Sequence, residues 1–191
     1  MLYDKTEVIK VASIFGFSIK NVTTFMGREG QGSQGNIYYN NKKVGWYNNR
    51  DDGGESDIDF DGDRAKRTEM ENLLKEAVRK YYERFPLTGE FACLNGNVQI
   101  FMEDLIKFTE DEKELKKYQK EGYIGMAKYQ KIGEPYYEYT LLFKRGKAIE
   151  EFQKRADIEN ARIYTKDAFV ITDEVPQIEG EVQEKPPNMG M

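Results

Sequence analysis

The chain has 191 residues, a formal net charge of −5 and no histidine. A third of its residues are charged, and no apolar run approaches the roughly 20 residues that a membrane-spanning helix needs. Without histidine, Ser-His and Cys-His nucleophile pairs, histidine general bases and histidine-ligated zinc are excluded. The single cysteine, Cys93, excludes a disulfide scaffold and a multi-cysteine metal site, and it fits a reducing cytoplasm.

The N-terminal segment carries none of the apolar run of a signal peptide and instead predicts a short amphipathic helix. Asp4 and Glu7 have the spacing of a capping box, and apolar residues recur over positions 8–15. Residues 19–26 then predict a strand. The glycine-rich stretch 27–35 lacks the Lys-Ser/Thr ending of a phosphate-binding loop and leads into a strand, so we expect it to be a connection only.

The centre of the chain predicts an antiparallel meander. Apolar and polar residues alternate over positions 37–39 and 44–46, and the alternation resumes at 58–60. Asn40-Asn41 suits the tight turn between the first two strands, because asparagine tolerates a positive φ. We expect Trp46, on the middle strand, to be buried beneath the helix that follows.

That helix is predicted over Arg67–Phe85. Its apolar residues are spaced three and four apart from Met70 onward, and Pro86 ends it. We expect its apolar face to lie across the sheet.

Less regular elements are predicted after Pro86. Asn95-Gly96 indicates a hairpin over 91–102, and the charged residues 103–121 predict one or two solvated helical segments meeting near Thr109. The remaining predictions are a hairpin over 125–144, a helix over 147–156, a strand over 162–171 and a disordered acidic tail from Thr172.

Together these elements predict an α+β fold. An antiparallel sheet, a meander around residues 19–60, would be covered by the amphipathic helix, and a second hairpin-and-helix unit would follow. The corresponding divisions are residues 1–86, residues 87–171 and the tail 172–191. The first two divisions could also form one domain.

An acidic stretch is the most conspicuous chemical feature. Seven carboxylates follow one another with no lysine or arginine between them: Asp51, Asp52, Glu55, Asp57, Asp59, Asp61 and Asp63. Asp57, Asp59 and Asp61 repeat the first half of a calcium-binding loop, which makes them candidate metal ligands. The twelfth loop position, which needs a bidentate carboxylate, is Thr68, so we expect no bound metal and no cofactor.

The same carboxylates could imitate nucleic-acid phosphates and occupy a basic groove of another protein. The carboxylates could instead belong to an edge strand and serve only to prevent it from pairing with another sheet. A tyrosine-rich hairpin (Tyr129, Tyr136, Tyr137, Tyr139) has the composition either of a recognition surface or of a core. The expected partner-binding residues are Asp51, Asp52, Glu55, Asp57, Asp59, Asp61, Tyr136 and Tyr137.

Direct nucleic-acid binding is not expected. The lysines between Lys113 and Lys120 are interspersed with glutamates, which favours a salt-bridged helix over a basic patch.

Residues 25–60 contain YYNNKKVG followed by DDGG, and residues 116–129 read KKYQKEGYIGMAKY. These blocks resemble small uncharacterised proteins carried by phages and mobile elements of low-GC Gram-positive bacteria. The resemblance transfers no catalytic residue. It implies accessory phage cargo, among which inhibitors of host defence such as anti-CRISPR proteins are prominent. The implied partner is a host defence protein or ribonucleoprotein, for example a CRISPR effector nuclease, in the cytoplasm of the host bacterial cell.

The leading hypothesis is therefore a phage-encoded, non-enzymatic inhibitor that binds a host defence nuclease or its guide complex. One alternative is a carboxylate-based, metal-dependent phosphodiester enzyme, in which Asp57, Asp59 and Asp61 with Glu69 or Glu71 would hold the metal. Another is a structural or packaging-associated phage protein.

Overall fold

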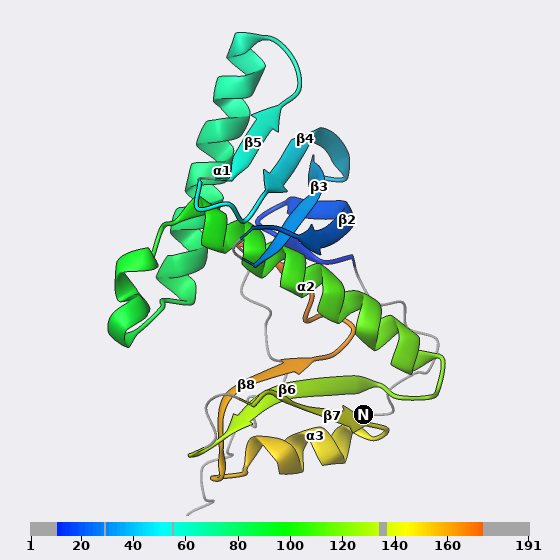
Figure 1. The fold of residues 1–191 in the computed structure, drawn as a ribbon. Coiled ribbons are helices and arrows are strands. Elements are labelled where there is room, and N and C mark those ends of the chain that lie inside the picture. Colours follow the sequence, from blue (N-terminus) through cyan, green and yellow to red (C-terminus); the bar gives the residue numbers. More distant parts are fainter. Residues whose placement is uncertain (1–10, 29, 55, 134–136, 174–191) are drawn as a thin grey trace, which may run out of the picture.

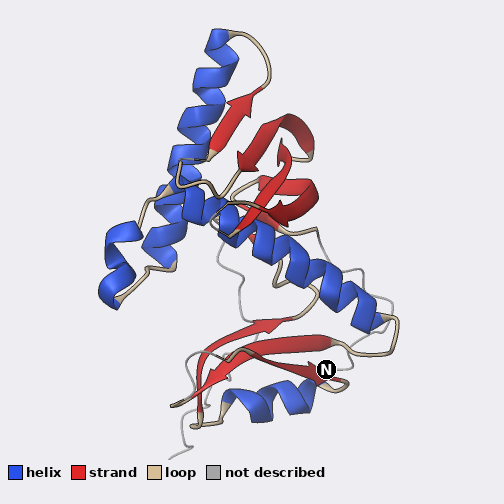
Figure 2. Cartoon of the chain, in the orientation of Figure 1, coloured by secondary structure: helices blue, strands red, loops and turns tan. Residues whose placement is uncertain are grey.

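The computed structural model describes residues 11–28, 30–54, 56–133 and 137–173. The fold is α+β, as predicted, with two β-sheets and α-helices around them (Figures 1 and 2). The helices are α1 (Arg64–Arg84), α2 (Val98–Gln119) and α3 (Gly146–Gln153), with a 3-10 helix at Gly89–Leu94. The strands are β1 (Ser13–Ile14), β2 (Phe17–Met26), β3 (Gln31–Tyr39), β4 (Lys42–Asn49), β5 (Asp57–Phe60), β6 (Gly125–Lys131), β7 (Tyr139–Phe143), β8 (Ile158–Tyr164) and β9 (Val170–Ile171).

The larger sheet contains the predicted meander. Its strand order is β5-β4-β3-β2-β1-β9, and β2 to β5 are antiparallel to their neighbours. The predicted turn joins β3 to β4, where Asn40 and Asn41 have φ of 47° and 65°. Two successive positive φ values are what a type I′ hairpin requires, so local sequence alone determines this connection.

One face of this sheet, the inner face, packs against both long helices. The core contains Ile37, Tyr47 and Phe60 from the sheet, with Leu74 and Val78 from α1 and Phe101 and Leu105 from α2. The predicted covering helix is thus confirmed as α1. It begins three residues earlier than expected, because Asp63 caps it: the Asp63 Oδ1 atom accepts a hydrogen bond from the Lys66 N–H at 3.0 Å.

Replacing this cap should have a measurable cost. We expect Asp63→Ala to lower the free energy of unfolding by about 1 kcal/mol, because it leaves an N–H of the first helical turn without a partner. Urea denaturation measures the loss. Asp63→Asn, which keeps the accepting oxygen, should stay close to the wild type, and an equal loss in both variants would contradict the capping role.

Trp46 lies on the other side of the sheet from the one predicted. Its side chain is 39 % exposed, whereas its neighbour Tyr47 is fully buried. The reason is a β-bulge: Ile37 pairs with Gly45 but Tyr38 pairs with Lys43, so Val44 is an extra residue in β4. An extra residue reverses which side chains face inward, and the prediction that Trp46 is buried beneath the helix is wrong.

The hairpin predicted over 91–102 is also wrong, whereas the helical character predicted over 103–121 is confirmed, in one helix that begins earlier and is partly buried. Residues 89–94 form the 3-10 helix and 98–119 form the single helix α2, with Asn97 as its cap. Asn95 does not turn a hairpin; its side-chain amide hydrogen-bonds both the N–H and the C=O of Leu87, at 2.8 and 3.0 Å. Thr109 is no cap either, since its buried hydroxyl donates to the Leu105 C=O within the helix.

The smaller sheet has the order β7-β6-β8 and carries α3. The predicted hairpin over 125–144 and the helix over 147–156 correspond to β6–β7 and α3. The strand predicted over 162–171 is divided, because β8 ends at Tyr164 and β9 returns to the larger sheet, where it pairs in parallel with β1. Of the predicted N-terminal helix, residues 1–10 lie outside the described residues, and residues 13–14 form β1 instead.

Helix α2 lies between the two sheets (Figure 1). Its first half packs in the core of the larger sheet, and Leu115 packs with Met126 of β6 and Tyr164 of β8. Both α2 and β9 come after Pro86 in the sequence, yet both pack with the larger sheet. The division into two units near Pro86 stays a prediction. The tail from 174 lies outside the described residues. No helix in the described part of the chain combines the length and the apolar content needed to cross a bilayer.

Candidate functional site

The larger sheet presents a second face, the outer face, which is the one opposite the two helices. We define it by the side chains that alternate with the buried ones on the three strands from β3 to β5: Gln34, Asn36, Tyr38, Trp46, Asn48, Asp57 and Asp59. Their alternation follows from the strand period of two, once the bulge at Val44 is taken into account.

The register arranges these side chains in rows. Asn36, Trp46 and Asp59 stand opposite one another, and Gln34, Asn48 and Asp57 form the adjacent row. Side chains directly opposite one another in antiparallel strands are close neighbours. The only tryptophan of the chain thus lies between Asn36 of β3 and Asp59 of β5.

A shallow hollow of about 270 Å³ adjoins Trp46. Three amide side chains line it, from Asn21, Gln34 and Asn36. Asn21 has a φ of 55° at an irregularity in the pairing of β2 with β3. The outer face therefore combines an exposed indole with polar groups that are able to donate and accept hydrogen bonds.

Two of the predicted carboxylates are held by arginines. Asp57 pairs with Arg50 at 3.0 Å, and Asp59 pairs with Arg67 at 3.3 Å. All four side chains are about half exposed, and exposed ion pairs contribute little to stability. Each carboxylate also keeps lone pairs for a further donor, so both remain available to a partner.

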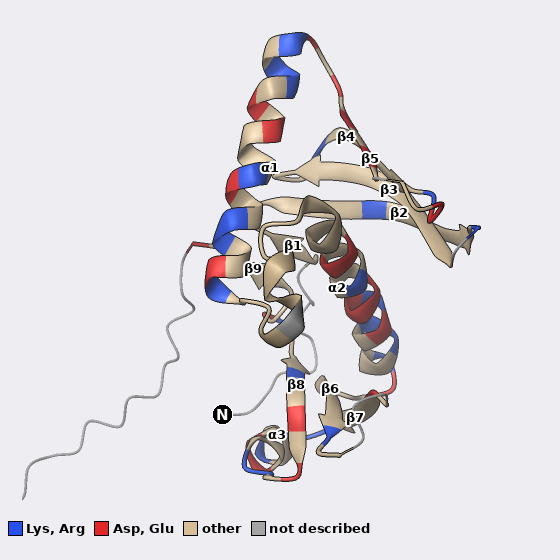
Figure 3. Cartoon of the chain, turned by 60° about the vertical axis from the view of Figure 1, so that its left-hand side comes forward, with Lys and Arg blue, Asp and Glu red and all other residues tan. Residues whose placement is uncertain are grey.

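The other predicted acids do not converge with this pair. Asp51 and Asp52 lie in the β4–β5 loop, where Asp52 accepts a hydrogen bond from the Gly54 N–H. Asp61 follows β5 at its far end, about 13 Å from the start of the strand at the usual rise of 3.3 Å per residue. Figure 3 shows the acidic residues distributed along this loop and strand, with a second group on α2. Glu55 lies outside the described residues.

The tyrosine-rich hairpin separates into two environments. Tyr129 is buried, where it stacks on Tyr139 and meets Phe152 edge to face. Tyr137 is exposed, and Tyr136 lies outside the described residues. The core interpretation therefore holds for Tyr129. Among the described members only Tyr137 has the exposure of a recognition residue, and it lies just before β7 of the smaller sheet.

The metal candidates do not assemble a site in the described residues. No group of three or more His, Cys, Asp or Glu side chains there is placed to hold a metal ion. Asp57 and Asp59 face arginine side chains instead, and Asp61 lies beyond the strand.

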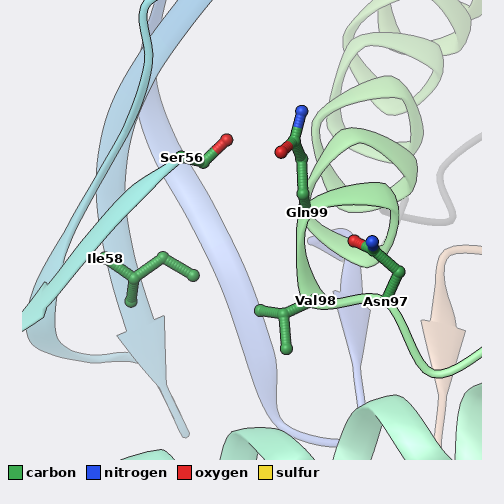
Figure 4. A pocket seen from close by; sticks show the side chains of 5 residues that line it. All are labelled: Ser56, Ile58, Asn97, Val98 and Gln99. Atoms are coloured by element: carbon green, nitrogen blue, oxygen red, sulfur yellow. The ribbon is translucent and has the colours of Figure 1, made fainter. Parts of the chain in front are cut away.

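A further hollow of about 250 Å³ opens on the inner side, between the start of β5 and the N-terminus of α2. Figure 4 shows Ser56 and Gln99 facing each other across it. The Ser56 hydroxyl lies 3.3 Å from the Tyr47 hydroxyl, and burial raises the pKa of Tyr47 above its ordinary value of 10.0. These groups support the core beneath the outer face.

Sequence reasoning missed Trp46 and the amides as members of a surface. The alternation of Asn36 and Tyr38 with Ile37 and Tyr39 was a signal for it, but the bulge at Val44 hid its continuation onto β4. Comparison of the chain with known protein families, with curated proteins and with solved structures found no match.

Proposed function

We propose that this chain is a phage-encoded, non-enzymatic inhibitor that binds a host defence nuclease or its guide complex. The observation that carries the proposal is the outer face, where exposed Trp46 lies beside the half-exposed carboxylate Asp59, with Asp57 in the next row. Tryptophan is enriched among the few residues that dominate binding energy at protein interfaces. Carboxylates around it would steer the chain to a basic groove and exclude nucleic acid from the same surface.

The ion pairs of the outer face fit this role. Arg50 and Arg67 hold Asp57 and Asp59 in extended positions on β5 without burying them. Because such exposed pairs are weak, a lysine or arginine of the partner can join or replace them at little cost. The enzyme alternative has no comparable support, since the same arginines stand where a metal would have to be coordinated.

The proposal predicts a loss of affinity when the charges are removed. Changing Asp57 and Asp59, the two carboxylates of the outer face, to Asn should weaken binding by about tenfold or more and should act mainly on the association rate. Binding by the wild type should also weaken as salt rises, because screening limits exposed charges to about 8 Å at physiological ionic strength. Surface plasmon resonance against purified effectors measures both rates.

The test begins with co-purification of the chain with candidate CRISPR effectors, with and without guide and target, followed by a cleavage assay. A matched control is Glu150→Gln with Glu159→Gln, two exposed carboxylates of α3 and β8. The proposal fails if no effector is bound or inhibited. If inhibition survives in the outer-face variant as in the control, the carboxylates of the outer face are not the binding surface, and Tyr137 is the next residue to change.

A further inference from the structure

The smaller sheet ends in an edge strand, β7, whose outer side pairs with no strand of the described residues (Figure 1). An edge strand presents backbone N–H and C=O groups to other chains, and proteins usually protect it with charged residues, prolines, bulges or a very short length. The other edge strands carry such protection. Strand β5 contains Asp57 and Asp59, β9 has only two residues, and β8 contains Glu159 and Arg162 and has a bulge in its pairing with β6.

Strand β7 has none of these protections. Its five residues, YTLLF, include no charged residue and no proline, and its pairing with β6 is regular. Thr140 and Leu141, near its centre, are exposed, and the Tyr137 side chain just before it is 66 % exposed. A regular, uncharged edge with exposed apolar side chains is the kind of strand to which another strand adds.

The residues of β7 are complementary to themselves. In an antiparallel pair of two β7 strands centred on Leu141, this residue stands opposite its own copy, and Tyr139 stands opposite Phe143. One residue beyond each end, Glu138 stands opposite Lys144 of the second copy, and the two-fold axis makes this contact twice. Opposite charges in cross-strand positions stabilise a pair of strands, whereas like charges destabilise it.

The two charged side chains are available for such a contact. Glu138 is 44 % exposed, and its surface ion pair with Lys107, at 3.1 Å, contributes little to stability. Lys144 is exposed, and its ammonium nitrogen lies 4.6 Å from the centre of the Tyr123 ring. Glu138 and Lys144 are six positions apart, so the strand period of two directs both side chains to the same side of the sheet.

The same edges limit the assembly to two copies. A pair through β7 would join two three-stranded sheets into one sheet of six strands, with β8 at both of its ends. The charged residues and the bulge of β8 oppose further pairing there. A two-fold contact also uses the same patch on both partners, so it closes on itself.

We infer that two copies of this chain associate through β7, in an antiparallel pairing centred on Leu141. The pairing gives the edge strand further hydrogen-bond partners, covers Leu141 and places Glu138 of each copy beside Lys144 of the other. A contact of this length is small beside the interfaces of permanent dimers, so we expect a dissociation constant on the order of 10 µM. None of these residues belongs to the outer face, so the inference does not depend on the proposed function.

Sedimentation velocity of the full chain, from about 1 to 500 µM, measures the association. Leu141→Lys should raise the dissociation constant of the dimer about tenfold or more, because the two-fold axis places the two new charges opposite each other. The matched control is Met26→Lys, which adds the same charge in place of an apolar side chain that is 86 % exposed at the end of β2. The control should dimerise as the wild type does. A wild type that stays monomeric over this range, or an equal loss in the control, would overturn the inference.

An exchange of charges tests the register. Glu138→Lys and Lys144→Glu should each weaken the dimer about tenfold, because each places like charges opposite one another at two positions. The double variant restores opposite charges, and its dissociation constant should return to within about twofold of the wild-type value. A double variant that dimerises no better than the single ones would contradict this register.

Cross-linking tests the two-fold axis directly, in chains that also carry Cys93→Ser to remove the native thiol. Leu141→Cys should form a covalent dimer on oxidation, because directly opposite Cα atoms are about 4.5–5.5 Å apart and a disulfide spans that distance. Tyr137→Cys is the control, since its two copies would be eight positions apart along the strands, or about 26 Å. Equal cross-linking of the two variants on a denaturing gel would indicate random collision and would overturn the inference.

Discussion

Tyr47→Ala is expected to lower the free energy of unfolding by about 3–5 kcal/mol, because truncating a buried aromatic residue leaves a large cavity. The Tyr47 side chain is fully buried in the core that the larger sheet shares with α1 and α2. Its hydroxyl also lies within hydrogen-bonding distance of Ser56. Equilibrium denaturation in urea, with the slope checked for two-state behaviour, measures the loss.

The adjacent residue provides the control. Trp46→Ala should cost only about 1 kcal/mol, because its side chain is 39 % exposed on the outer face. Both substitutions truncate an aromatic side chain on β4, so the difference between their losses in free energy of unfolding shows which side of β4 faces the core. If Trp46→Ala proves the more costly change, the bulge at Val44 is misplaced.

Lys128→Ala is expected to destabilise the chain by about 3–5 kcal/mol, because removing one member of a buried ion pair leaves the other charge uncompensated. Lys128 is 13 % exposed and its partner Asp111 is 1 % exposed. Lys107→Ala is the matched control, since the Lys107–Glu138 pair has side chains 43 % and 44 % exposed and should contribute less than about 1 kcal/mol. Similar losses in the two variants would contradict the buried pair.

The same ion pair predicts a dependence on pH. Burial lowers the pKa of Lys128, but hydrogen bonds to Asp111 and Glu114 more than offset it, and the pKa lies above its ordinary value of 10.5. A lysine whose pKa is raised by folding stabilises the folded state below about pH 10.5, and this contribution is lost as the pH rises through the folded-state value. The wild type should therefore lose more stability than Lys128→Met as the pH rises above about 10.5.

The elements predicted correctly are those that their own residues specify. Asn40 and Asn41 adopt the positive φ values that a type I′ turn needs, and the alternating residues on either side form β3 and β4. Helix α1 carries its apolar residues at helical spacing and its own cap at Asp63. These preferences act within a few residues, so a reader of the sequence can recognise them.

The elements predicted incorrectly depend on distant contacts. Asn95-Gly96 is a turn signal, but the Asn95 side chain binds Leu87 and the chain continues into α2. The charged segment 103–121 has the composition of a solvated helix. Two of its acids are nevertheless buried, because Lys128 reaches Asp111 and the Ala12 N–H donates to Glu112 from 100 positions earlier in the chain.

By itself the sequence determined the α+β class, the antiparallel order of β2 to β5, the helix that covers them and the exclusion of histidine chemistry. The tertiary structure alone decided that Trp46 faces outward beside Asp59, and that β7 forms an edge of the smaller sheet. The physical reason is the range of the interactions. Backbone preferences and hydrophobic period are properties of one segment, whereas burial, strand register and charge pairing are settled by residues that meet only in the folded chain.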